Sequence, residues 1–113
     1  MTLNDEATTE TLDNAFQAHF GAAALERAER QTASEDFSII PDAYGVPYTY
    51  WFLGGSDPAY FEKGAAMQKV PTNHSPFFAP VIDPTLSMGV QAHVVAALAY
   101  LAPAGIAGTG AAA

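Results

Sequence analysis

Residues 48–55, Tyr-Thr-Tyr-Trp-Phe-Leu-Gly-Gly, decide the fold class that we predict for this chain. The run from Tyr48 to Leu53 is aromatic, β-branched and aliphatic, as strands usually are, and Gly54 and Gly55 end it. Both faces of such a strand would be apolar, which is typical of a central strand covered by helices. The sequence therefore predicts part of an α/β sandwich with residues 48–53 as a central strand.

A helix is predicted before this strand. Apolar residues recur at spacings of three and four between residues 12 and 20, which places them on one helix face. Asn4 or Thr8 is expected to cap its start and Gly21 to end it. Residues 22–31 stay open between helix, edge strand and loop.

A longer helix is predicted after the strand, from Pro84 to about Leu101. Asp83 followed by Pro84 is a cap and a first helical position. Gly89 inside the helix suggests close packing against a strand. One apolar stripe is expected to pack on a face of the sheet, and it consists of Leu86, Val90, Val94, Ala97, Leu98 and Leu101.

Between the first helix and the strand, Ser34 is expected to cap a short helix that ends at Pro41. Glu35 and Asp36 would lie in its first turn, where acids favour the helix dipole. On this pattern alone a structural role is favoured over a functional one. Residues 56–78 carry turn residues and no sustained period, so we expect mostly loop there.

Composition restricts the possible partners and compartments. The 113 residues hold twelve acids against four bases, for a formal charge of −8, which argues against binding nucleic acid or an anionic membrane surface. Cysteine is absent, which excludes disulfides and thiolate-ligated zinc. Residues 1–10 lack the pattern of a signal peptide, and the longest apolar stretch, residues 94–108, is too short to cross a bilayer. A cytoplasmic location is expected.

A second polar cluster lies at Asn73-His74-Ser75-Pro76-Phe77-Phe78. A single loop histidine is commonly a surface residue. A proline and two aromatic residues after it, however, would hold the loop rigid and present the imidazole to a site. From these residues alone, a ligand and a surface residue are equally supported.

Four features in this order resemble one family. They are the turn at Ser34–Ser38, the aromatic strand, the His74–Phe78 segment and the long alanine-rich helix. Together they resemble the aminoacylase-like metallo-amidohydrolases, which include hippurate hydrolases, plant auxin-conjugate hydrolases and carboxypeptidase G relatives. The resemblance runs from about Asn4 to Leu101. It implies a three-layer α/β sandwich fragment, the C-terminal part of a zinc-peptidase-like catalytic domain over residues 1–102, followed by a flexible tail at 103–113.

The resemblance also implies a metal site. His74 matches the last metal ligand of the family, with Glu35, Asp36, Asn73 and Ser75 as supporting residues near the site. The complete enzyme would hold divalent zinc, manganese or cobalt, between which imidazole and carboxylate ligands do not discriminate. The upstream ligands and the glutamate that serves as general base have no counterpart in this chain, so no catalytic residue is assigned. The other two histidines, at positions 19 and 93, are expected to be ordinary helix residues.

Two functions follow as expectations. In the first, the chain is the C-terminal portion of a metal-dependent amidohydrolase that cleaves amide bonds of small N-acyl amino acids, and it is inactive alone. In the second, it is a non-catalytic remnant or interaction module that pairs with another chain. Either way, a strand with too few helices to cover it predicts self-association or binding to a missing N-terminal portion.

Overall fold

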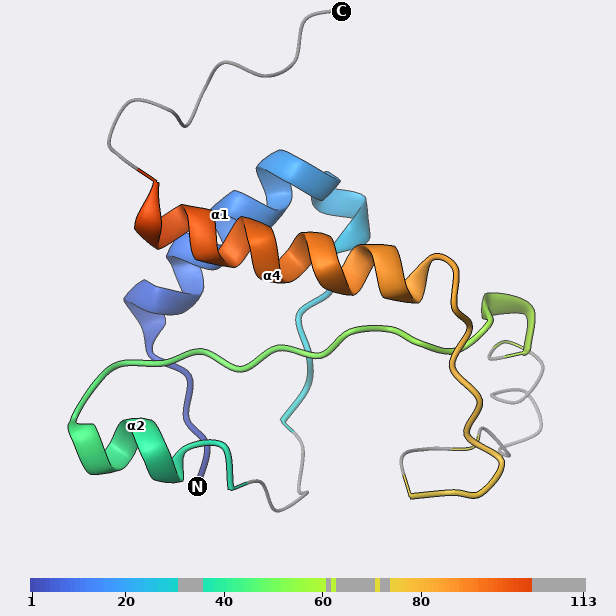
Figure 1. The fold of residues 1–113 in the computed structure, drawn as a ribbon, viewed down its shortest axis with the longest axis horizontal. Coiled ribbons are helices and arrows are strands. Elements are labelled where there is room, and N and C mark those ends of the chain that lie inside the picture. The colour runs from blue at the N-terminus through green and yellow to red at the C-terminus, as the bar shows by residue number, and fades with distance from the viewer. Residues whose placement is uncertain (31–35, 61, 63–70, 72–73, 103–113) are drawn as a thin grey trace, which may run out of the picture. The chain divides into compact units, whose positions relative to one another are not determined.

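A computed structural model describes residues 1–30, 36–60, 62, 71 and 74–102. Its helices are α1 (Glu6–Phe20), a 3₁₀ turn η1 (Ala22–Ala24), α2 (Ile39–Tyr44) and α4 (Thr85–Leu101), drawn in Figure 1. The chain divides into two compact units: Met1–Phe52 together with the residues from Ala92 onward, and Leu53–Gln91. Helix α4 contributes its first part to the second unit and the remainder to the first.

Helix α1 confirms the helix predicted before the strand, but its cap is a different residue. Asp5 has an extended backbone (ψ 133°), and its carboxylate accepts a hydrogen bond from the Thr8 backbone N–H at 2.8 Å. This is the usual N-cap arrangement, because it satisfies one of the free N–H groups of the first turn. Gly21 ends the helix as predicted, with φ at 83° and its N–H bonded to Gln17 O.

The predicted central strand is wrong as a strand: residues 48–53 form no β-ladder, although they follow an extended path (Figure 1). The backbone of this segment is hydrogen-bonded mainly to the side chain of Asn4. Asn4 Nδ2 donates to Tyr50 O and Tyr50 N donates to Asn4 Oδ1, both at 2.8 Å, and Asp5 N donates to Tyr48 O at 2.9 Å. The Asn4 side-chain amide takes the place of a peptide group on a neighbouring strand. It therefore satisfies the backbone N–H and C=O of Tyr50 without forming a sheet.

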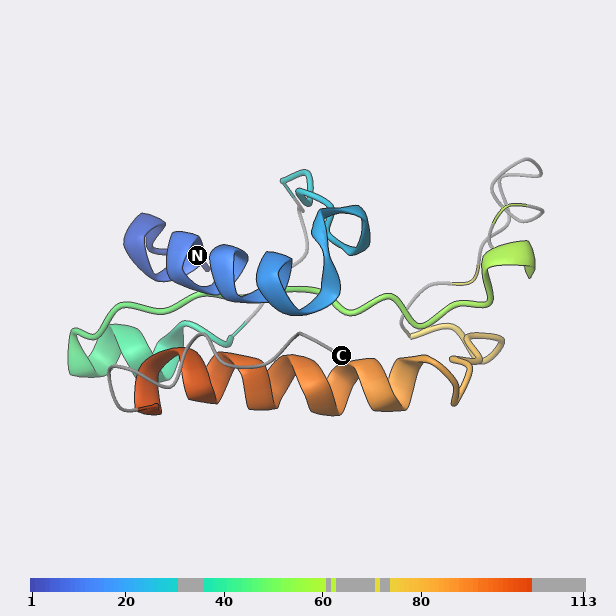
Figure 2. The same cartoon turned by 90° about the horizontal axis from the view of Figure 1, so that it is seen from above.

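A small core lies in the first unit. Its buried residues are Leu12 and Phe16 of α1 and Ala92 of α4, and the Trp51 ring packs edge-on to Phe16 at 5.6 Å between centroids. The same ring lies 5.5 Å from the ring of His93. The extended segment therefore runs between α1 and α4, as Figure 2 shows. This core confirms the apolar face predicted for α1.

Helix α4 confirms the predicted helix but not its predicted face. The core is contacted by Ala92, Val95 and Ala96, whereas the aliphatic stripe is exposed, with Leu98 56% and Leu101 79% accessible. The small side chains of Ala92 and Ala96, and not the larger aliphatic ones, are therefore the part of α4 that meets the core. Gly89 packs closely as suggested, but against an extended segment and not a strand: a Cβ built there would lie 3.0 Å from Leu53 Cδ2.

Two smaller elements also differ from the predictions. Helix α2 begins at Ile39, with Ser38 at its cap position, and contains Pro41, so Pro41 does not end it; Ser34, the predicted cap, lies outside the described residues. Pro41 is tolerated because it lies in the first turn, where its missing N–H would have no helical partner. Residues 58–60 are helical where a loop was expected, and residues 25–30 form no regular structure.

The α/β three-layer sandwich is therefore not what the described residues form. They are helices and irregular segments, and no strand or sheet occurs among them. Among the described residues, no second extended segment pairs along residues 48–53, whose partners are Asp5 N and the Asn4 side chain. β-propensity describes how side chains fit a pleated surface, and it supplies no partner strand.

Candidate functional site

His74, the predicted metal ligand, lies in a turn of the second unit and is exposed. Its backbone is left-handed, with φ at 70°, and it is the one non-glycine residue of the described chain with positive φ. Such a conformation costs free energy for a residue with a Cβ, although histidine adopts it more often than most. The turn therefore holds the imidazole outward in an unusual backbone state.

Ser75, predicted to support the site, supports the turn instead. Its Oγ accepts a hydrogen bond from Phe77 N at 3.2 Å, and its carbonyl accepts one from Phe78 N at 3.1 Å. The two bonds close the turn directly after His74, as the rigid loop predicted from Pro76 requires. Phe77 is 78% exposed, so this aromatic residue does not anchor the turn in a core.

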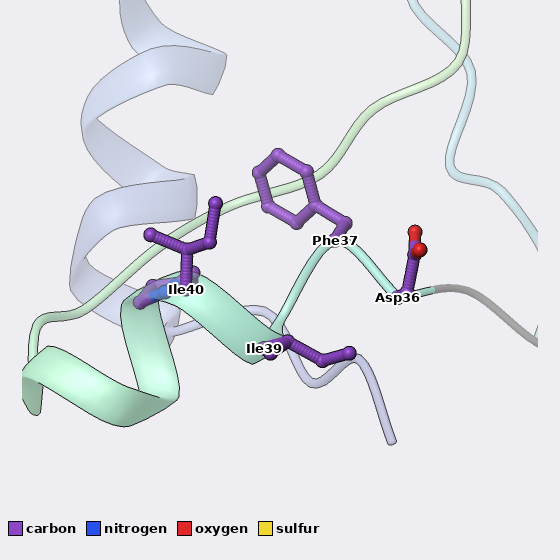
Figure 3. Close-up of a pocket in the computed structure, with 5 residues that line it drawn as sticks. Asp36, Phe37, Ile39 and Ile40 are labelled. Carbon is purple, nitrogen blue, oxygen red and sulfur yellow. The ribbon is translucent and has the colours of Figure 1, made fainter.

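Asp36, from the predicted acidic turn, lies just before α2 at the edge of an apolar pocket. The lining residues are Asp36, Phe37, Ile39, Ile40 and Pro41. Figure 3 shows the Asp36 carboxylate apart from the side chains of Ile39 and Ile40. The Asp36 carbonyl accepts a hydrogen bond from Ile39 N at 3.0 Å, which shapes the entry to the helix. The pocket suits an apolar group rather than a metal ion.

An aromatic cluster next to this pocket was missed by the sequence reasoning. The Phe37 ring lies 5.7 Å from the ring of Tyr48 and 5.1 Å from that of Tyr50, and Tyr50 lies 5.3 Å from Phe52. Residues 48, 50 and 52 share one face because side chains alternate along an extended chain. The alternation was visible in the sequence, but Phe37 had been assigned to a helix turn.

The described residues do not by themselves fit a complete metal site. Asp36 belongs to the first unit and His74 and Ser75 to the second, while Glu35 and Asn73 lie outside the described residues. In the described part of the chain, no three His, Cys, Asp or Glu side chains are grouped so that they could hold an ion. A catalytic metal needs about three protein ligands. One imidazole supplies a single ligand, so a zinc, manganese or cobalt ion would need further ligands.

His19 and His93 occupy α1 and α4, as expected. Each ring packs on an aromatic neighbour, His19 on Phe20 at 4.6 Å and His93 on Trp51 at 5.5 Å. These contacts give both histidines a packing role.

Comparison with known proteins gives no assignment. No protein-family model matches the chain, and no solved structure matches it. Within the described residues, no helix has both the length and the apolar character needed to cross a membrane.

Proposed function

We propose that this chain contributes one metal ligand, His74, to a metal-dependent amidohydrolase that cleaves amide bonds of N-acyl amino acids. The remaining ligands and the general base would come from a further polypeptide portion, in the same or another chain, and the chain alone would be inactive. Its location would be the cytoplasm.

The observation that carries the proposal is the backbone of His74. Left-handed conformations of non-glycine residues cost about 1–3 kcal/mol and tend to cluster at functional sites. Here the residue that adopts one is also the residue that matches the metal ligand of the resembled family. The His74 imidazole is exposed, and the turn after it is closed by Ser75. Such an imidazole could bind a metal ion whose other ligands come from another portion of polypeptide.

The need for a further portion is supported by the apolar surface of the first unit. Val94, Leu98 and Leu101 of α4 are 51%, 56% and 79% exposed, while the buried core holds few residues. Monomeric proteins rarely expose large contiguous apolar patches, and such patches commonly mark interfaces. A portion that carries the missing ligands would cover this surface.

The experiment is reconstitution. The chain is co-expressed with an N-terminal portion of an aminoacylase-like enzyme that carries the other ligands, and hydrolysis of N-benzoylglycine is measured with zinc, manganese or cobalt added. We expect metal-dependent hydrolysis by the complex and none by the chain alone. His74→Ala should abolish the activity of the complex, because one ligand is lost.

His19→Ala is the matched control, since His19 is another exposed histidine and lies in the other unit, where its ring packs on its helix neighbour Phe20. This variant should keep the activity of the complex. Circular dichroism should show that His74→Ala leaves the thermal midpoint of the chain almost unchanged. Activity of the chain alone, or full activity of the His74→Ala complex, would contradict the proposal.

A second candidate is a non-catalytic interaction module. It is favoured by the same exposed face of α4, which needs a partner whether or not a reaction takes place. A complex that forms readily but never hydrolyses an N-acyl amino acid would support it. The reading frame before Met1 is the simplest discriminator, because an amidohydrolase portion encoded there would favour the enzyme.

A further inference from the structure

The extended segment has one satisfied edge and one free edge. The N–H and C=O groups of successive residues in an extended chain point to opposite edges. Tyr48 and Tyr50 direct theirs toward Asn4 and Asp5, which bind them. On the opposite edge, no backbone hydrogen bond from the described residues reaches Thr49 or Trp51.

The two faces of the segment are occupied, so the free edge is the open side. Thr49 Oγ1 lies 3.0 Å from Thr9 Oγ1 of α1, and Trp51 packs on Phe16 and His93. The opposite face carries the Tyr48 and Tyr50 rings against Phe37. Helices therefore cover one face and an aromatic side chain the other, while the peptide groups of Thr49 and Trp51 have no hydrogen-bond partner among the described residues.

Charge favours a second copy of the chain as the occupant of this edge. The chain carries a formal charge of −8, yet every residue between Asp42 and Asp57 is uncharged. Local charge therefore does not oppose the approach of a second copy along this stretch. A short segment with high β-propensity, no charge and no proline also has the composition that pairs with its own copies.

We propose that the isolated chain self-associates by strand pairing along the Thr49–Trp51 edge, which joins the extended segments of two copies. The pairing supplies the backbone partner that Thr49 and Trp51 lack among the described residues of one copy. It does not depend on the amidohydrolase proposal, since neither His74 nor a metal takes part.

The test combines association with amide exchange. Sedimentation velocity over a wide dilution series should show a dimer that dissociates on dilution. Amide exchange followed by NMR should show Tyr50 N–H protected at every concentration, because Asn4 binds it. The N–H groups of Thr49 and Trp51 should become protected only at concentrations where the dimer forms.

Two lysine variants locate the interface. Phe52 and Leu98 are both 56% exposed, so either substitution should leave the fold intact. Phe52→Lys places a charge on the pairing segment, as natural edge strands do to block pairing, and it should weaken the dimer at least about tenfold. Leu98→Lys changes the exposed face of α4 and should leave the dimer unchanged.

Three outcomes would overturn the inference. A chain that stays monomeric at all concentrations has no pairing edge. A dimer that Leu98→Lys dissociates and Phe52→Lys does not is formed by the face of α4. A dimer in which the Thr49 and Trp51 amides exchange as fast as in the monomer is not held by strand pairing.

Discussion

The charge of Asp5 supports the start of α1, because its carboxylate caps the helix. The backbone N–H of Thr8 donates to its carboxylate, with a smaller contribution from the Thr8 side chain, and this lowers the pKa of Asp5 below its usual 3.8. The carboxylate form is thus favoured in the folded chain. Its contribution to stability is present above the unfolded pKa and is lost as pH falls through the lowered folded value.

The start of α1 should therefore weaken in acid. Far-UV circular dichroism from neutral to acid pH should show helicity decreasing below about pH 4, where this carboxylate takes up a proton. Asp5→Ala should have lower helicity at neutral pH and a smaller acid-dependent loss. Glu10→Gln, which removes a charge from the middle of α1, is the control and should retain the acid-dependent loss. An unchanged pH profile in Asp5→Ala would show that the cap is unimportant.

Residue types predicted the structural role of some single residues and missed that of others. Gly21 ends α1 as its conformational freedom suggests, whereas the cap proved to be Asp5 and not Asn4. The reason is that Asn4 binds Tyr50, a partner distant in sequence that no local pattern reveals. For His74, the sequence indicated a rigid loop, but its left-handed backbone appears only in the structure.

Among the elements, helices were easier to predict than their surroundings. The spacing of Leu12 and Phe16 predicted both the helix and its buried face. In α4 the larger aliphatic residues were predicted to be the buried face, but they are exposed. Periodicity identifies an apolar stripe on a helix, but it does not show which segment the stripe packs against. The strand prediction failed for the same reason, since Tyr48–Leu53 has strand composition but no neighbouring strand.

Gly89 allows a test of how α4 meets the extended segment. An alanine Cβ would lie 3.0 Å from Leu53 Cδ2, the end of a flexible side chain that is 45% exposed and has room to shift. Gly89→Ala should thus gain most of the helix propensity difference, and stability should rise by up to about 1 kcal/mol.

Gly89→Val is the steric counterpart, because its branched side chain leaves Leu53 no comparable adjustment. Urea denaturation should show a higher midpoint for Gly89→Ala and a lower one for Gly89→Val. If Gly89→Ala is strongly destabilised, the helix and Leu53 are packed too rigidly to adjust. If both variants resemble the parent chain, the contact is absent in solution.

At the scale of the whole molecule, the described residues form helices and a small core in the first unit, and they leave the aliphatic face of α4 and the Thr49–Trp51 edge of the extended segment without a partner among themselves. Self-association or binding to a further portion, expected from the apolar segments of the sequence, stays a prediction. The arrangement of the helices could not be predicted, because it depends on contacts such as Asn4 with Tyr50 that join residues distant in sequence. At the candidate site, the described residues group no further His, Asp or Glu side chains with His74 into a metal centre.

The central claim is that His74 becomes a metal ligand once the remaining ligands are supplied. Calorimetric titration of zinc into the reconstituted complex tests it most directly, with the His19→Ala complex as the control. Loss of residues that merely support a ligand costs about 10–100-fold in metal affinity, so loss of the ligand should cost no less. We predict that the parent and His19→Ala complexes bind zinc equally and that His74→Ala binds at least about 100-fold more weakly. Equal zinc affinity in the His74→Ala complex would contradict the claim.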